Sequence, residues 1–268
     1  DRGDTSPAAE NPVAMAAING RRTDLYEALT SEDVVHLFRL RERKTAPTIQ
    51  RTVVFILTAA CEQLHPGLEL RTEFSYGRGV YCRLLGLDAP LTSEQIADIE
   101  ARMHDLVAAD HPITPHVYGI RELISAARQR GRDATTHLAQ YMRRDSLKLY
   151  RMPGTRHLFY GRQLPSTGYV RAFRLVRQAP GFLLQVGPSG APEKLFPPVQ
   201  QPKFFEVMRR YADEREERDE RAEELDDGDA GVAGDGREAL CEDSVDAEVS
   251  PDGRFGARHT DHSTSQPF

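Results

Sequence analysis

Hydrophobic residues along this 268-residue chain follow two spacings, and each spacing predicts a different kind of element. Apolar residues at i, i+3 or i+4 and i+7 predict an amphipathic helix over 93–109, which Thr92 and Gln95 begin with a capping-box pattern. A helix beginning at Thr48 and running to about residue 64 is apolar almost all round, so we expect it to be buried. Further helices are expected over 117–129, from 133 to about 142, and from Pro202, where Phe204, Met208 and Tyr211 would share one face.

Runs rich in β-branched and aromatic residues predict strands between these helices. A strand over 13–19 ends in Asn19-Gly20, a strong hairpin-turn signal, and residues 68–85 predict two strands joined near 76–79. The other strands are expected over 34–40, 146–152, 156–160, 169–177 and 181–186. Clustered helices with meander-like strands favour an α+β fold with a largely antiparallel sheet.

Charge divides the chain into a basic body and an acidic tail. Residues 1–211 carry 29 basic and 22 acidic side chains, whereas residues 212–268 carry 6 basic and 19 acidic ones. The tail has almost no apolar residues to bury, so we expect it to be mostly disordered after a few charged turns that extend the last helix. The polar residues 1–12 are likewise expected to be disordered.

The basic charge is densest over 143–177, where nine Arg and Lys residues face a single acidic one, Asp145. Basic strands with interleaved tyrosines suit phosphate contacts and base stacking, which favours a phosphate-bearing ligand, a nucleotide or RNA as the partner. Two other readings stay open: a generic solvated face, and a surface that docks the chain's own acidic tail.

Several classes of function are excluded by what the sequence lacks. There is no P-loop, no H-E-x-x-H and no paired C-x-x-C, and the nine histidines never occur at i, i+4 spacing, so we expect no metal or cofactor in this chain. No apolar run is long enough for a transmembrane helix and no secretory signal opens the chain. With only three cysteines, a cytoplasmic location is expected.

Two loops could contact an anion. The PSTG run at 165–168 offers several N–H groups and two hydroxyls, as an anion-binding nest does, although it also reads as an ordinary turn. Aromatic residues around Gly77-Arg78-Gly79 form the second candidate, with an ordinary hairpin and a half-buried Tyr81 as the alternative.

The order of motifs resembles a known family. The runs TIQRTVVFILTAA, FSYGRGVYCRL, LTSEQIADIEARMHDLVAADHPI, FYGRQLPSTGYVRAFRL and PPVQQPKFFEVMRRY resemble the N-terminal half of bacterial uridine kinase-like nucleoside kinases. That half is similar to the TGS domain and the second additional (editing) domain of threonyl-tRNA synthetase. The resemblance implies a partial TGS-like segment at 13–45 and an editing-like domain at 46–211, between the segments 1–12 and 212–268.

Two departures limit what the resemblance implies. The metal-capable positions of the synthetase editing domain correspond here to Arg51, Phe55, Phe159 and Gln163, and none of these can ligate zinc, so editing by that mechanism is not expected. The P-loop kinase domain that follows in the family has no counterpart in this sequence, and ATP and Mg²⁺ would be expected only for that domain.

The leading hypothesis is therefore a non-catalytic accessory module that binds a phosphate-bearing ligand, nucleotide or RNA in a basic cleft. Arg51 and Tyr81 would line the cleft, and the ligand would contact Lys148, Tyr160, Arg162, Ser166, Thr167 and Tyr169. The alternatives are a nucleoside kinase whose catalytic domain is missing from the chain and, more weakly, an aminoacyl-tRNA deacylase using another base such as His157.

Overall fold

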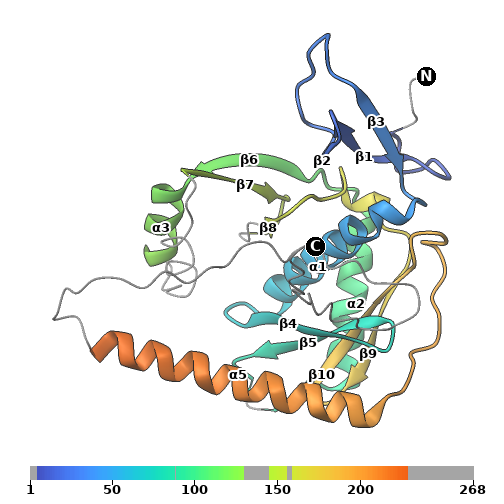
Figure 1. Cartoon of the computed structure of the whole chain (residues 1–268). Helices are drawn as coiled ribbons and strands as arrows, with labels where there is room; N and C mark the ends of the chain where they lie inside the picture. The colour runs from blue at the N-terminus through green and yellow to red at the C-terminus, as the bar shows by residue number, and fades with distance from the viewer. Residues whose placement is uncertain (1–4, 88, 130–144, 156–158, 229–268) are drawn as a thin grey trace, which may run out of the picture. The chain divides into compact units, whose positions relative to one another are not determined.

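The computed structural model describes residues 5–87, 89–129, 145–155 and 159–228. Contacts within the chain divide it into two units, Asp1–Glu216 and Glu217–Phe268. The described strands form three sheets of three, four and three strands, and every strand pair is antiparallel. These sheets and the helices beside them confirm the α+β expectation (Figure 1).

The small N-terminal sheet has the order β2 (Arg21–Thr23), β1 (Val13–Ile18) and β3 (Val35–Arg39). Asn19 and Gly20 have φ angles of 51° and 81°, which confirms the predicted hairpin turn between β1 and β2. Every residue of β1 is buried, so this strand is the core of the small sheet.

The four-stranded sheet has the order β4 (Glu69–Tyr76), β5 (Gly79–Leu85), β10 (Gly181–Val186) and β9 (Phe173–Gln178). The predicted turn at 76–79 is confirmed, with φ angles of 55° at Gly77 and 68° at Arg78. The predicted start of β9 at residue 169 is wrong, because Thr167–Tyr169 form a 3-10 turn before the strand.

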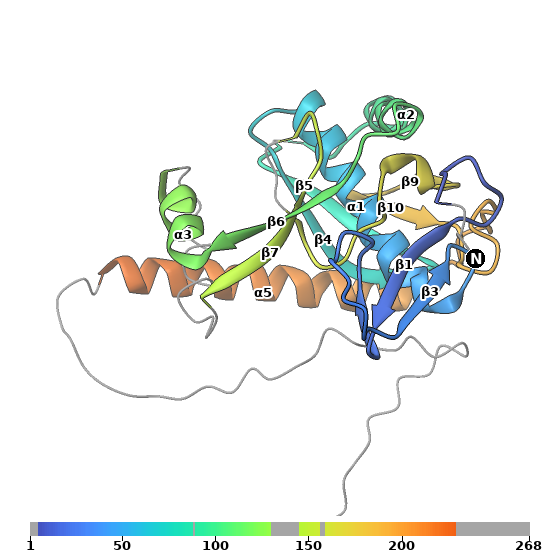
Figure 2. The same ribbon diagram turned by 90° about the horizontal axis from the view of Figure 1, so that it is seen from above.

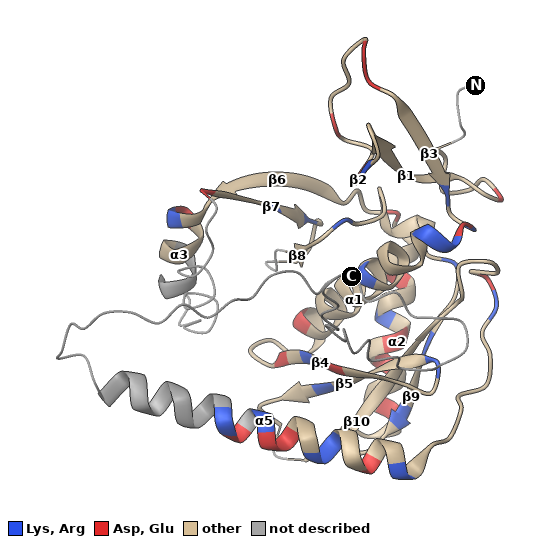
Figure 3. Cartoon of the chain, viewed as in Figure 1, with Lys and Arg blue, Asp and Glu red and all other residues tan. Residues whose placement is uncertain are grey.

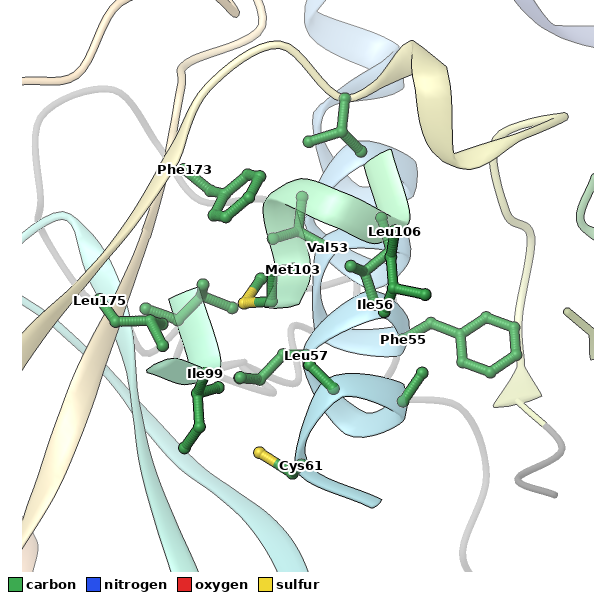
Figure 4. Packing of buried hydrophobic residues seen from close by; sticks show 14 of the residues in the cluster. Val53, Phe55, Ile56, Leu57, Cys61, Ile99, Met103, Leu106, Phe173 and Leu175 are labelled. Carbon is green, nitrogen blue, oxygen red and sulfur yellow. The ribbon is translucent and has the colours of Figure 1, made fainter. Parts of the chain in front are cut away.

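Two helices cover one face of this sheet. Side chains of α1 (Ala46–Leu64) and α2 (Ser93–Ala108) share one hydrophobic cluster with Cys82, Phe182 and Leu184 of the strands. Figure 4 shows Leu57 of α1 beside Ile99 and Met103 of α2, whereas Phe55 points to another side of α1. The all-round apolar pattern of α1 thus reflects burial on more than one side.

The starts of these helices were predicted with unequal success. The capping box of α2 is confirmed, since the Thr92 hydroxyl accepts from the Gln95 N–H and the Gln95 side chain accepts from the Thr92 N–H. The predicted start of α1 at Thr48 is wrong, because the helix begins at Ala46 after Thr45. Thr48 is buried inside the first turn, with its hydroxyl 3.7 Å from Met15 Sδ of β1.

The first part of helix α5 (Pro202–Gly228) packs through Phe205 on the opposite face of the same sheet. The sequence pattern grouped Phe204 with Met208 and Tyr211, but Phe205 is the buried residue, 9% exposed, while Phe204 is 41% exposed. Phe205 packs among Tyr76 and Tyr81 and thereby fixes the face that α5 presents to the sheet. Acidic and basic side chains alternate along the described part of α5 (Figure 3).

The third sheet, seen from above in Figure 2, has the order β6 (Thr114–Gly119), β7 (Ser146–Arg151) and β8 (Phe159–Tyr160). The predicted helix over 117–129 is wrong for its first three residues, which pair with β7, and α3 spans Ile120–Gln129. The helix expected from 133 lies outside the described residues.

The N-terminal residues from Thr5 onward contact the rest of the first unit. The Thr5 carbonyl accepts from the Tyr169 hydroxyl, and the Ala9 carbonyl accepts from Arg171. The domain boundaries implied by the family resemblance stay predictions. None of the described helices is both long and apolar enough to cross a membrane.

Candidate functional site

The four residues that the family resemblance places at the metal-ligand positions of the synthetase editing domain lie together in this fold. Arg51 and Phe55 are four residues apart on α1 and therefore share one side of the helix. The Phe55 ring stacks on that of Phe159 in β8, with centroids 4.9 Å apart and an interplanar angle of 22°. A methyl group placed on Gly161 would lie 3.2 Å from Arg51 Cδ, so the loop after β8 lies directly against Arg51.

This cluster is packed with side chains and offers no metal site. Gln163 is 2% exposed, and its Oε1 accepts a hydrogen bond from the Thr52 hydroxyl at 3.0 Å. The same hydroxyl accepts from the Leu164 N–H. Within the described part of the chain, no group of three or more His, Cys, Asp or Glu side chains could hold a metal ion. None of the four residues is a zinc ligand, and Phe55 and Gln163 are buried in contacts with other parts of the protein.

A buried polar network lies beside this cluster. Register places Tyr150 opposite Phe159, so Lys148, Tyr150 and Phe159 share one face of the third sheet. Lys148 Nζ lies 2.8 Å from Asp24 Oδ2 and 3.0 Å from Glu27 Oε2, and the Tyr150 hydroxyl donates to Asp24 Oδ2 at 2.6 Å. Asp24 and Glu27 follow β2, so the small sheet supplies both carboxylates of this network.

The network shifts the pKa values of its charged residues. Burial alone would raise the pKa of Asp24, but hydrogen bonds from Lys148, Tyr150 and the Tyr26 N–H hold it below its ordinary 3.8. Hydrogen bonds from Lys148 and Thr23 lower the pKa of Glu27. Burial opposes the charge of Lys148, yet the two carboxylates raise its pKa overall. All three groups are therefore charged at neutral pH.

Arg162 adds a further donor to the same region. Burial and the Asp24 carboxylate raise the pKa of Tyr150, and the positive charge of Arg162 opposes this rise, which places Arg162 within electrostatic reach of Tyr150. Arg162 Nε is buried without a hydrogen-bond partner among the described residues. Arg41 Nε and Arg174 Nε are unsatisfied in the same way, but Arg162 is the one that lies beside this network, where an acceptor from a ligand would be stabilised.

The Asp24 network makes the free energy of unfolding depend on pH. Because the folded pKa of Asp24 is depressed, its contribution to stability is present above pH 3.8 and is lost as pH falls through the folded value. We expect Asp24→Asn to lower the free energy of unfolding by about 2 kcal/mol at pH 7, a typical value for the loss of hydrogen bonds to a charged group. Urea denaturation at several pH values should show this difference shrinking below about pH 4. The exposed Glu32→Gln in the same loop is the control, and an undiminished difference at pH 3 would contradict the assignment.

The predicted anion nest at 165–168 is filled by a side chain of the protein itself. The Asp110 carboxylate accepts from the Ser166 hydroxyl and, at 3.1 Å, from the Gly168 N–H. The Thr167 hydroxyl is fully buried, donates to the Leu106 carbonyl at 2.6 Å and accepts from the His111 N–H at 2.9 Å. Ser166 and Thr167 hold the loop to the end of α2, so neither belongs to the ligand set we propose.

Tyr81 and Tyr169 also have structural contacts in place of the predicted ligand contacts. Tyr81 has no exposed surface, its hydroxyl accepts from the Gly181 N–H at 3.0 Å, and burial raises its pKa to about 12. Tyr169 is buried and its hydroxyl donates to the Thr5 carbonyl. Both rings are buried among the protein's own residues, so we leave Tyr81 and Tyr169 out of the ligand set proposed below.

The other basic and aromatic residues of 143–177 are spread over several elements. Tyr160 is 55% exposed on the edge strand β8 and points to the face opposite Phe159. Arg174 and Arg177 donate to the Gln185 side chain and the Leu91 carbonyl, so they support β9. Arg143, Arg144 and Arg156 lie outside the described residues, so the single basic face stays a prediction.

A hollow of about 520 Å³ lies elsewhere, at the C-terminal end of α1. It is lined by Glu62, Gln63, Pro66, Gly67, Gly154 and Thr155, and none of the eight predicted ligand residues is among them. Since Glu62 is the charged residue in this lining, the hollow does not suit an anion.

Sequence reasoning missed four residues of the site region: Asp24, Glu27, Asp110 and Tyr150. Asp24 and Lys148 are 124 residues apart, and Asp110 and Ser166 are 56 apart, so no local spacing connects them. One signal in the sequence pointed toward these residues. The segment 143–177 contains few acidic residues, so acidic partners for its basic side chains were to be expected from other segments.

Comparison with known proteins shows distant similarity to one kind of protein. A scan of protein-family models gave no match. The chain is 25% identical over 166 residues to the threonine–tRNA ligase of Rickettsia akari, and 27% over 174 residues to that of Symbiobacterium thermophilum. It is 26% identical over 178 residues to the threonine–tRNA ligase of Maricaulis maris. These matches cover 62%, 65% and 66% of this chain but only 26–28% of the ligases, so the chain spans about a quarter of their length.

Proposed function

We propose that this chain is a non-catalytic binding module for a phosphate-bearing ligand, with tRNA or another RNA as the first candidate. The observation that carries the proposal is a pair of arginines near Gly161: Arg51, which lies against it, and Arg162, which follows it in the chain. Guanidinium groups bind phosphate oxygens through several N–H donors, and Arg162 Nε has no acceptor among the described residues. The distant similarity to threonine–tRNA ligases supports RNA over other phosphate carriers.

The proposed ligand set is smaller than the one predicted from sequence. It consists of Arg51 and Arg162, with the exposed Tyr160 at the rim for base stacking. Lys148 belongs to the set only when its two carboxylate partners release it. The fully buried Phe55 and Gln163 keep water and metal out of the site, which argues against hydrolysis.

Salt dependence tests this binding. Two to three phosphate contacts on a single strand give a log–log slope of affinity against salt of about −1.5 to −2. Fluorescence titration of labelled tRNA at two ionic strengths should give this slope, and Arg51→Ala with Arg162→Ala should weaken binding about tenfold or more. Arg210→Ala, an exposed arginine on α5, is the matched control. The proposal would be refuted if no binding is found at low salt, or if the affinity is unchanged by both arginine substitutions.

Two further functions follow from the family resemblance alone. In the nucleoside-kinase context the module would accompany an ATP-dependent phosphotransferase domain, and a P-loop encoded in any frame downstream of residue 211 would support that context. Aminoacyl-tRNA deacylation is the weaker alternative, because its candidate base His157 lies outside the described residues and the metal positions are filled. We expect mischarged tRNA to be hydrolysed no faster with the protein than without it.

A further inference from the structure

We propose that the loop after β2 is a built-in competitor for the ligand: its carboxylates, Asp24 and Glu27, occupy the place at Lys148 where a phosphate group of the ligand would bind. This inference concerns regulation of the same site and rests on the proposed function. It predicts that ligand binding at Lys148 and docking of this loop exclude each other.

The geometry of the network resembles that of a bound anion. Lys148 Nζ has one carboxylate oxygen at 2.8 Å and another at 3.0 Å, and the Tyr150 hydroxyl donates to the same Asp24 oxygen that Lys148 contacts. A phosphate group presents several acceptor oxygens on one centre, so it can accept from the ammonium and the hydroxyl together. The two donors are thus arranged for an anion, and the chain's own carboxylates supply it.

Another cation beside the network also lacks an acceptor. The positive charge of Arg162 acts on Tyr150, and Arg162 Nε is buried without an acceptor among the described residues. Asp24 and Glu27 therefore satisfy Lys148 and Tyr150 but leave this arginine nitrogen unpaired. A phosphate group bound to Lys148 and Tyr150 carries more negative charge than either carboxylate and would interact with Arg162 as well, which favours exchange of the loop for the ligand.

The loop is held in a way that permits release. The Asp24 side chain is 3% exposed, but Glu27 and Lys148 are 32% and 35% exposed, so solvent and ligand reach the outer half of the network. A further hydrogen bond from the loop is a long one, from the Tyr26 hydroxyl to the Pro165 carbonyl at 3.4 Å. Half-exposed ion pairs contribute little net stability, so a multivalent anion can displace Glu27 first.

Removing the outer carboxylate tests the proposal. We expect Glu27→Gln in the full chain to raise the affinity for a fluorescein-labelled 12-nucleotide RNA about fivefold at low salt, since an ion pair of this kind is worth up to about that factor. Glu32→Gln removes the same charge from an exposed position of the same loop and should leave the affinity nearly unchanged. Adding Lys148→Gln to Glu27→Gln should cancel the gain.

Hydrogen exchange supplies a second readout. The Tyr26 N–H donates to Asp24 Oδ1 at 2.9 Å, while Lys148 and Tyr150 hold Asp24 Oδ2, so undocking releases the carboxylate that protects this amide. Saturating RNA should speed exchange of the peptide 21–30, opposite to the slowing that a ligand usually causes where it binds.

The outcomes separate the two proposals. Equal affinity gains for Glu27→Gln and Glu32→Gln, or slower exchange at 21–30 with RNA bound, would overturn the competitor role while leaving RNA binding intact. RNA that binds none of the variants at low salt would overturn the proposed function itself.

Discussion

Phe205→Ala should lower the free energy of unfolding by about 3 kcal/mol or more, the cost of truncating a buried phenylalanine. Its ring centroid lies 5.0 Å from that of Tyr81, 5.1 Å from Tyr76 and 5.9 Å from Phe74, so this residue attaches α5 to the four-stranded sheet. Urea denaturation followed by circular dichroism measures the loss. The helical signal should also fall at low urea if α5 detaches before the rest of the first unit unfolds.

The neighbouring residue provides a matched control for this change. Phe204 is 41% exposed, and its ring stacks on that of Tyr76 with the centroids 6.5 Å apart. We expect Phe204→Ala to cost less than about 1 kcal/mol, as exposed substitutions usually do. If Phe204→Ala costs as much as Phe205→Ala, then α5 is rotated from the position described here, toward the face that the sequence pattern predicted.

Gly181→Ala should destabilise the protein by at least about 3 kcal/mol, because a side chain cannot be placed there without moving the backbone. A Cβ atom on Gly181 would lie 2.1 Å from the Cys82 carbonyl oxygen and 3.0 Å from the Tyr81 hydroxyl. The Gly181 N–H also donates to that hydroxyl, so movement of the backbone would break a buried hydrogen bond. Thermal and urea denaturation both measure the effect.

Gly190→Ala is the control, since a Cβ atom there would have no neighbour within 4 Å. Its effect should stay within about 0.5 kcal/mol. Equal stability of the two variants would contradict the close approach of β5 and β10, and with it the structural role assigned to Tyr81.

Local signals in the sequence predicted much of the fold because they act between near neighbours. The Asn19-Gly20 turn and the Thr92–Gln95 capping box each depend on residues at most three apart, and both are confirmed. The secondary structure was predicted wrongly where tertiary contacts determine it. Residues 117–119 pair with β7 instead of beginning a helix, because pairing with a strand some 30 residues away outweighs local propensity.

The candidate site was predictable only in part, for a similar reason. The correspondence of Arg51, Phe55, Phe159 and Gln163 came from a family resemblance, and the structure places these residues together. The polar loop at 165–168 looked ready for an external anion, but Asp110 supplies that anion from the end of α2. Whether the donors of such a loop can bind an external anion depends on whether the fold places a carboxylate against them. The amino-acid composition does not reveal this.

The ion pairs at the start of the last helix have a practical consequence for anyone who shortens the protein. The Asp213 carboxylate accepts from Arg83 of β5 at 3.2 Å and from Arg209 at 2.7 Å. A fragment cut at Tyr211, where the charge of the sequence changes sign, would lose this carboxylate and leave the mostly buried Arg83 with less compensation. A fragment cut after Glu216, where the first contact unit ends, would keep it and is the better starting point for crystals or spectra.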